Sequence, residues 1–115
     1  MNKASTAFFV GAAMFLAAAP TLAQVKGDAQ AGAQKVAMCV GCHNIPGYHT
    51  AFPQVYRVPK LDGQHAGYIV SALKAYKSGD RHHPSMRAIA ASLTDQDMAD
   101  LGAFFSHAPT QSASR

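Results

Sequence analysis

The chain contains no glutamate, and its acidic side chains are six aspartates. These aspartates fall where helix caps or turns are expected, so no pair of carboxyl groups is evident for general acid–base catalysis. The ten Lys and Arg residues are scattered and form no dense basic tract, which gives nucleic-acid binding little support. Both absences argue against an enzyme and against a nucleic-acid-binding protein.

The first 23 residues have the features of a secretory signal peptide. Lys3 supplies a positive charge, Ala7 to Ala19 form an apolar run, and small residues precede a cleavage point after Ala23. A retained membrane anchor is the alternative, but a helix over this run would be only about 20 Å long, against a hydrocarbon core of roughly 30 Å. We therefore expect export to the periplasm, removal of residues 1–23 and no membrane span in the mature protein.

Residues 24–115 are then expected to form one small domain with no internal repeat. Loss of Lys3 lowers the formal net charge of +4 by one, so the mature chain stays mildly basic, which fits steering toward an acidic partner. Chains of this size bury a low fraction of their surface and often depend on a covalent or metal staple. The only two cysteines lie in one motif, so a prosthetic group held by them could supply part of the core.

Three segments have the apolar spacing and end signals of helices. The first runs roughly from Asp28 to Met38 and ends at the cysteine motif. The second runs from Gln64 to Lys77 and stops at Ser78-Gly79. The third runs from Asp95 to about Ser106, with Thr94 as its N-cap. Alternating strand patterns are scarce, so the sequence predicts an all-α fold.

Two connecting segments are predicted to be loops. Residues 43–63 are rich in proline, glycine and aromatic residues, which disfavours a long regular element. Residues 81–86 join the second and third predicted helices. We expect one long loop and one shorter loop around whatever the cysteine motif holds.

Cys39-Val40-Gly41-Cys42-His43 is the haem attachment motif. Two thiols at this spacing near a helical turn can each form a thioether with one of the two vinyl groups of a porphyrin. The next residue then directs its imidazole at the iron. The motif predicts one covalent haem c, attached through Cys39 and Cys42, with His43 as one axial ligand.

Two other uses of these cysteines fit the sequence less well. A redox-active disulfide of the thioredoxin type needs a βαβ context, and no such strands are evident. A zinc site could recruit some of the six histidines, but His43 directly follows Cys42 and is too close for the same tetrahedral site.

The second axial ligand decides what the iron can do. Methionine favours electron transfer, histidine lowers the potential, and an open position allows ligand binding or peroxidase chemistry. Met86 is the preferred candidate, because a loop after the second helix can fold over the opposite haem face. Met38 lies on the attachment helix itself, and Met98 fits the apolar face of the third helix. His82 and His83 stay open as alternatives.

Together these residues resemble a class I c-type cytochrome of the short, soluble, monohaem type found in bacteria. The similarity covers nearly the whole mature chain. The matching positions are Gly27-Asp28, Gly32, the attachment motif, Pro59 to Gln64, Tyr68, Gly79 to Arg81, Met86 and Leu93 to Phe105. The resemblance implies the cytochrome c fold, in which three main helices and their loops wrap around one haem.

The resemblance also implies roles for single residues. The carbonyl group of Pro59 would accept a hydrogen bond from His43 and fix the orientation of its imidazole. Met86 would be the second ligand of the iron. Arg57 and Arg81 are candidates for contacts with the haem propionates, and each can equally be a plain surface charge.

Two further features follow from the comparison with that family. Gly32 would lie where the first and last helices cross, against Phe104 or Phe105. Asn44 departs from the glycine that commonly follows the motif, and the loop 44–58 is long and aromatic. We expect this loop to wrap one edge of the haem.

The function implied is that of a diffusible periplasmic carrier that exchanges single electrons with redox partner proteins, such as oxidases, reductases or dehydrogenases. Lys60, Lys74 and Arg87 are candidates for a basic ring around an exposed haem edge. Two alternatives stay open. The chain could be the cytochrome subunit of a periplasmic dehydrogenase, or a ligand-binding or peroxidatic haem protein.

Overall fold

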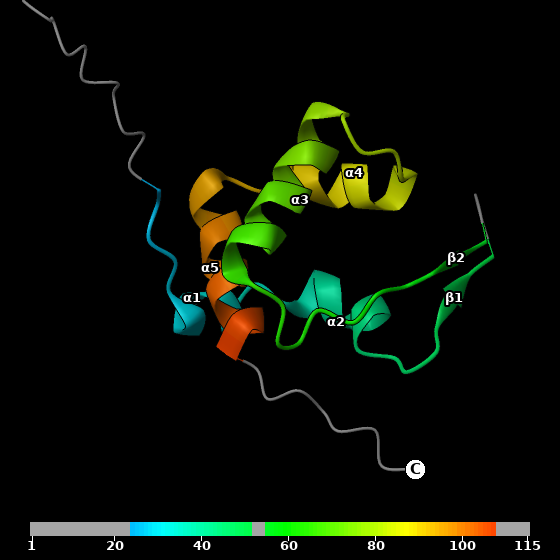
Figure 1. Cartoon of the computed structure of the whole chain (residues 1–115), viewed down its shortest axis with the longest axis horizontal. Helices are drawn as coiled ribbons and strands as arrows, with labels where there is room; N and C mark the ends of the chain where they lie inside the picture. The colour runs from blue at the N-terminus through cyan, green and yellow to red at the C-terminus, as the bar shows by residue number, and fades with distance from the viewer. Residues whose placement is uncertain (1–23, 52–54, 108–115) are drawn as a thin grey trace, which may run out of the picture.

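The computed structural model describes residues 24–51 and 55–107. The predicted signal peptide, at residues 1–23, lies outside the described residues. The described elements are α1 (Ala29–Ala33), α2 (Ala37–His43), β1 (His49–Thr50), β2 (Tyr56–Arg57), α3 (Ala66–Ser78), α4 (Pro84–Ala91) and α5 (Asp95–His107) (Figure 1). The fold is mostly helical, as predicted, and its one sheet within these ranges is a pair of two-residue strands.

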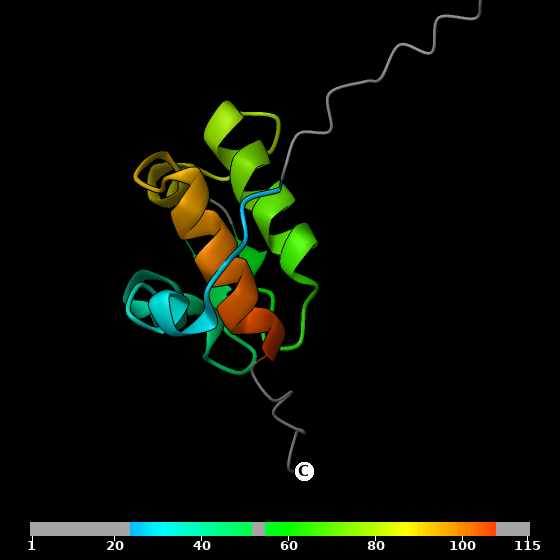
Figure 2. The same ribbon diagram turned by 90° about the vertical axis from the view of Figure 1, so that its left-hand side faces the viewer.

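Helix α5 is the centre of the packing. It contacts α1 and α3, and α3 also contacts α4 (Figures 1 and 2). The core side chains between these helices are Ile69, Leu73, Ala90, Leu93, Met98, Leu101 and Phe105. Met98 is fully buried, in agreement with the prediction that it packs in the core.

The ends of α3 and α5 follow the signals in the sequence. Thr94 and Asp97 form a reciprocal capping box, in which Asp97 N–H donates to Thr94 Oγ1 (3.1 Å) and Thr94 N–H donates to the Asp97 carboxylate (2.9 Å). Gly79 ends α3 with a φ of 95°, a left-handed conformation that glycine adopts without a steric penalty. Both helices lie within two residues of their predicted bounds.

The single helix predicted over residues 28–38 is wrong, because the chain forms two helices separated by a turn. The Asp28 carboxylate caps α1 by accepting from Gln30 N–H (2.7 Å). After α1, Lys35 N–H donates a 3₁₀-type hydrogen bond to the Gly32 carbonyl oxygen (2.9 Å). Helix α2 begins after Val36. The change of direction places the whole attachment motif inside α2 instead of after the end of a helix.

The prediction of a loop over residues 81–86 is also wrong, because the last three of these residues are helical. Helix α4 begins at Pro84, so Met86 lies in its first turn. Proline suits this position, because its missing N–H would have no partner in the first turn and its φ is already helical. His83 is the N-cap, and its Nδ1 accepts a hydrogen bond from Met86 N–H (3.4 Å).

The first and last helices cross at Gly32, as the resemblance implied. A Cβ on Gly32 would lie 2.2 Å from the Asp100 carbonyl oxygen and 2.8 Å from Phe104 Cβ. Phe104 is therefore the aromatic residue at the crossing, while Phe105 is buried in the core. Only glycine allows α1 to come this close to α5.

Replacing Gly32 by alanine should lower the free energy of unfolding by roughly 1–3 kcal/mol, because the added methyl group overlaps the backbone of α5. The matched control is Gly67→Ala in α3, where nothing lies within 4 Å of the new methyl group. This variant should keep its stability or gain up to about 1 kcal/mol. Chemical denaturation followed by circular dichroism measures both, and equal stabilities would contradict the close crossing.

A buried carboxylate ties the start of the described chain to α5. Asp100 is only 2% exposed. It accepts hydrogen bonds from Lys35 Nζ (2.7 Å), Asp28 N–H (2.9 Å) and Gln96 Nε2 (2.8 Å). Lys35 also forms an ion pair with Asp97 (2.7 Å). The Lys35 ammonium holds the pKa of both carboxyls below the usual aspartate value, and the two carboxylates in turn raise the pKa of Lys35.

The protein should lose stability as the pH falls through the lowered pKa values of Asp97 and Asp100, because the unfolded chain takes up protons first. This stabilisation is fully present above the ordinary aspartate pKa. In Lys35→Met the difference in unfolding free energy between about pH 5 and about pH 3 should shrink. Lys74→Met removes an exposed ion pair to Asp95 and should keep the wild-type pH dependence. Urea denaturation at the two pH values measures the difference, and an unchanged difference in Lys35→Met would contradict the assignment.

Candidate haem-binding site

Helix α2 presents the two thiols of the attachment motif on one face, since residues three positions apart are neighbours on a helix. Both cysteines are free. Cys39 is partly buried against the core cluster, and this burial raises the pKa of its thiol. Cys42 is exposed. Two thiols this close together on one rigid helix suit attachment to the two vinyl groups of one flat macrocycle.

His43 is held at the end of α2 by the backbone of a distant segment. Its Nδ1 lies 2.7 Å from the carbonyl oxygen of Pro59. A carbonyl oxygen can only accept, so Nδ1 carries the proton and donates. The lone pair of the neutral imidazole is then on Nε2, where it is available to a metal. The hydrogen bond to Pro59 is the contact that the resemblance implied.

Met86 lies on a different helix and borders the same core. Both Met86 and Cys39 are partly buried and pack against the core cluster. Residues far apart in the sequence, in α2 and in the first turn of α4, are thus brought to the edge of one apolar region. Ligation of iron by Met86 and by His43 stays a prediction.

The histidines that could replace Met86 as an iron ligand either make other contacts or are exposed. His83 caps α4 through Nδ1, and its ring makes an edge contact with Tyr56, with centroids 5.4 Å apart. His82 is exposed. His49 Nδ1 lies 2.8 Å from the Gly47 carbonyl oxygen, an ordinary local hydrogen bond.

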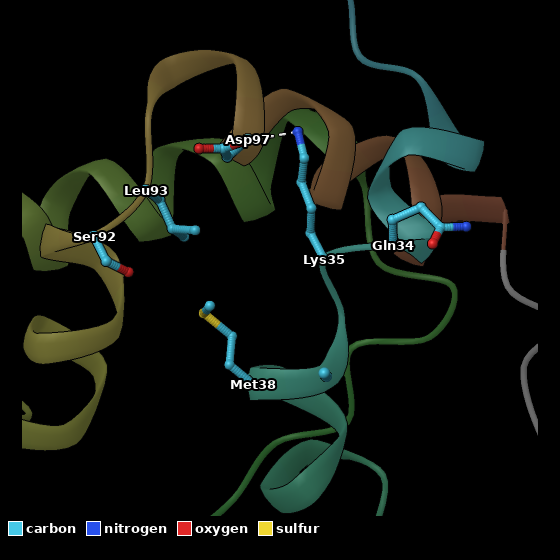
Figure 3. A pocket seen from close by; sticks show the side chains of 7 residues that line it. Gln34, Lys35, Met38, Ser92, Leu93 and Asp97 are labelled. Atoms are coloured by element: carbon cyan, nitrogen blue, oxygen red, sulfur yellow. Dashed lines mark ion pairs between the residues drawn. The ribbon is translucent and has the colours of Figure 1, made fainter.

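Met38 projects away from the helix that carries it. It lines a surface hollow of about 420 Å³ between residues 34–38 and the connection from α4 to α5, and its sulfur points toward Ser92 and Leu93 (Figure 3). The ion pair between Lys35 and Asp97 borders the same hollow (Figure 3). The side chain of Met38 is thus directed at the connection between α4 and α5.

The predicted basic residues lie at the surface. The guanidinium group of Arg81 stacks over the ring of Tyr76 at 4.9 Å, a cation–π contact, and Arg57 is exposed on β2. Contacts of these two arginines with haem propionates stay a prediction. Lys74 and Lys60 are both exposed. The Nζ atom of Lys74 lies 3.4 Å from the Asp95 carboxylate.

A protein-only metal site finds no support in the part of the chain that the structure describes. Within residues 24–51 and 55–107, no three His, Cys, Asp or Glu side chains gather into a group that could hold a metal ion. The zinc alternative needs such a group. The donor set of α2, two thiols followed by one correctly protonated imidazole, instead fits a covalent haem.

Fold and site together define an all-α protein built to hold one covalent haem. The family model described as Cytochrome c matches residues 29–109, and the chain belongs to this family. It carries covalently bound haem c and is an electron-transfer protein.

Three proteins of known name are similar to this chain. Cytochrome c-554(548) of Halomonas halodenitrificans is 41% identical over 83 residues, which cover 70% of this chain and 95% of that protein. The crystal structure of reduced recombinant cytochrome c4 from Pseudomonas stutzeri matches with a TM-score of 0.57 and 35% identity, over 71% of this chain and 46% of that one. A thiosulfate dehydrogenase electron acceptor of Stutzerimonas stutzeri is 37% identical over 75 residues, which cover 64% of this chain and 33% of the relative. The chain therefore spans less than half of the length of the last two.

The thioether bonds can be counted from the spectrum of the haem in alkaline pyridine. Cys39→Ser and Cys42→Ser should each leave one vinyl group intact and shift the main visible band to longer wavelength, because the remaining vinyl extends the conjugated system. The wild-type protein should give the shorter-wavelength band and should retain its haem in acidified ketone. Extraction of the wild-type haem by that solvent would contradict covalent attachment.

Proposed function

We propose that residues 24–115 form a periplasmic single-electron carrier whose iron is bound axially by His43 and Met86. The observation that carries this proposal is the hydrogen bond between His43 Nδ1 and Pro59. It leaves Nε2 for the iron and fixes the direction from which α2 approaches it. Met86 borders the same apolar core from α4 and is the most suitable second ligand.

Haem c supplies a one-electron couple between Fe(II) and Fe(III). His43 and Met86 would fill both axial positions in either state, so the ligand set need not change when an electron enters or leaves. The thioether sulfur of Met86 favours the reduced state and raises the potential. The apolar side chains next to Cys39 and Met86 limit the access of water, which also tunes the potential.

Exposed basic side chains support transient docking with acidic redox partners. Lys60 and Arg87 are exposed, and the carrier stays mildly basic, because loss of Lys3 lowers the formal net charge of +4 by only one. Complementary charge speeds encounter more than it strengthens binding, which suits a carrier that must also leave. The partners are oxidases, reductases or dehydrogenases that exchange single electrons.

Periplasmic location rests on the signal peptide in residues 1–23. Haem attachment after export is consistent with this location. Within residues 24–51 and 55–107, none of the helices is long and apolar enough to span a membrane. Expression of the full chain with a reporter at its C-terminus, followed by fractionation, tests cleavage after Ala23.

A dedicated role as the electron acceptor of one dehydrogenase is the second candidate. It is favoured by the relative that is named as a thiosulfate dehydrogenase electron acceptor. Stable co-purification with one larger catalytic subunit would support this role. Reversible reduction by several unrelated donors would support the diffusible carrier.

Replacing Met86 by alanine should abolish the sulfur-to-iron charge-transfer band of the oxidised protein. The reduction potential should fall by on the order of 0.1 V, because the ligand that favours Fe(II) is lost. The matched control is Met38→Ala, since Met38 is 46% exposed and lies on α2. This variant should keep the band and the potential. A band that persists in Met86→Ala would show that another residue binds the iron.

A further inference from the structure

One short segment of the chain contacts His43 directly and contacts His83, the N-cap of the helix that carries Met86. The Pro59 carbonyl oxygen holds His43 on the α2 side. Three positions earlier, the ring of Tyr56 meets the ring of His83 edge-on, with an interplanar angle of 88°. His83 is the N-cap of α4, the helix that carries Met86 in its first turn. Residues 56–59 therefore connect the environment of one proposed ligand to that of the other.

The backbone that carries Tyr56 is fixed by local pairing. Strands β1 and β2 pair antiparallel, with Thr50 opposite Tyr56. Tyr56 N–H donates to Thr50 Oγ1 (3.2 Å), and Val58 N–H donates to the Tyr48 carbonyl (2.9 Å). The hairpin β1–β2 thus presents the Tyr56 ring from a defined position.

His83 transmits this contact to Met86. Its Nδ1 accepts from Met86 N–H, so the orientation of the imidazole and the start of α4 depend on each other. Histidine is not among the preferred N-cap residues. The ring contact with Tyr56 is made by the same imidazole whose Nδ1 caps the helix.

We propose that Tyr56 and His83 are positioning residues for Met86, and that the hairpin β1–β2 thereby stabilises the bond between Met86 sulfur and iron. Tyr56 orients His83, His83 caps α4, and the capped first turn holds the Met86 side chain at the iron. The inference rests on the proposed function, because it requires Met86 to be the second ligand. It gives strands β1 and β2 a role in ligation.

The test measures how easily an external ligand displaces Met86. Imidazole is titrated into the oxidised holoprotein, and binding is followed by loss of the sulfur-to-iron band. Loss of a preferred N-cap shifts the equilibrium toward the uncapped turn by about fivefold, which is the upper end of the change expected for histidine. His83→Ala should therefore bind imidazole roughly two- to fivefold more tightly than the wild type. His83→Asn, which restores a good N-cap, should return the affinity to within about twofold of the wild type.

Tyr56 is tested by a second matched pair. Tyr56→Phe keeps the ring and should keep the wild-type imidazole affinity. Tyr56→Ala removes the ring and should bind imidazole more tightly, in the same direction as His83→Ala. His82→Ala changes the exposed neighbouring histidine and serves as the control, with no expected change. Thermal unfolding of each variant separates this local effect from a general loss of stability.

The outcomes separate the inference from the proposed function. If the wild-type protein lacks the sulfur-to-iron band, the assignment of Met86 fails. If the wild type has the band, but His83→Ala and Tyr56→Ala bind imidazole with wild-type affinity, the positioning role is overturned. Equal tightening in His83→Asn and His83→Ala would overturn the capping step.

Discussion

The hydrogen bond between His43 and the Pro59 carbonyl is the interaction on which the rest of the site depends. At 2.7 Å it decides which imidazole nitrogen carries the proton, and therefore which one can bind iron. It also joins the end of α2 to the segment that leads back into the hairpin β1–β2. If His43 binds the iron as proposed, its Nε2 would do so from the end of α2, and Met86 on α4 would supply the second ligand.

Helix α5 holds the segment that leads into α2. The close crossing at Gly32 sets the position of α1, and Lys35 in the following turn reaches both Asp97 and Asp100. Lys35 makes these contacts from the turn that separates α1 from α2. Because Asp100 is buried, the loss of Lys35 would leave its carboxylate without a counter-charge inside the protein. The segment that leads into the attachment helix is thus held by contacts that lie outside the motif itself.

The sequence predicted the parts of the structure that depend on local chemistry. The capping box at Thr94, the glycine stop at Gly79 and the apolar face of α5 are set by neighbouring residues, and the structure confirms them. The break after α1 has no proline signal, and the residue in the turn that follows, Lys35, pairs with Asp97 and Asp100, which lie more than 60 positions away in the sequence. Pro84 is a residue typical of the first position of a helix and could have predicted the start of α4. The N-cap, however, is His83, and histidine is not one of the residues that usually mark the start of a helix. The contact between Tyr56 and His83 depends on the fold of both segments, so the sequence alone could not predict it.

The central claim is that one particular methionine faces the iron, and nuclear magnetic resonance of the reduced holoprotein tests it most directly. With the methionine methyl groups labelled with carbon-13, the methyl group bound above the ring plane is shifted far upfield by the ring current of the porphyrin. The account predicts that this signal belongs to Met86, whereas Met38 and Met98 resonate in the ordinary methionine region. An upfield signal assigned to another methionine, or no such signal, would contradict it.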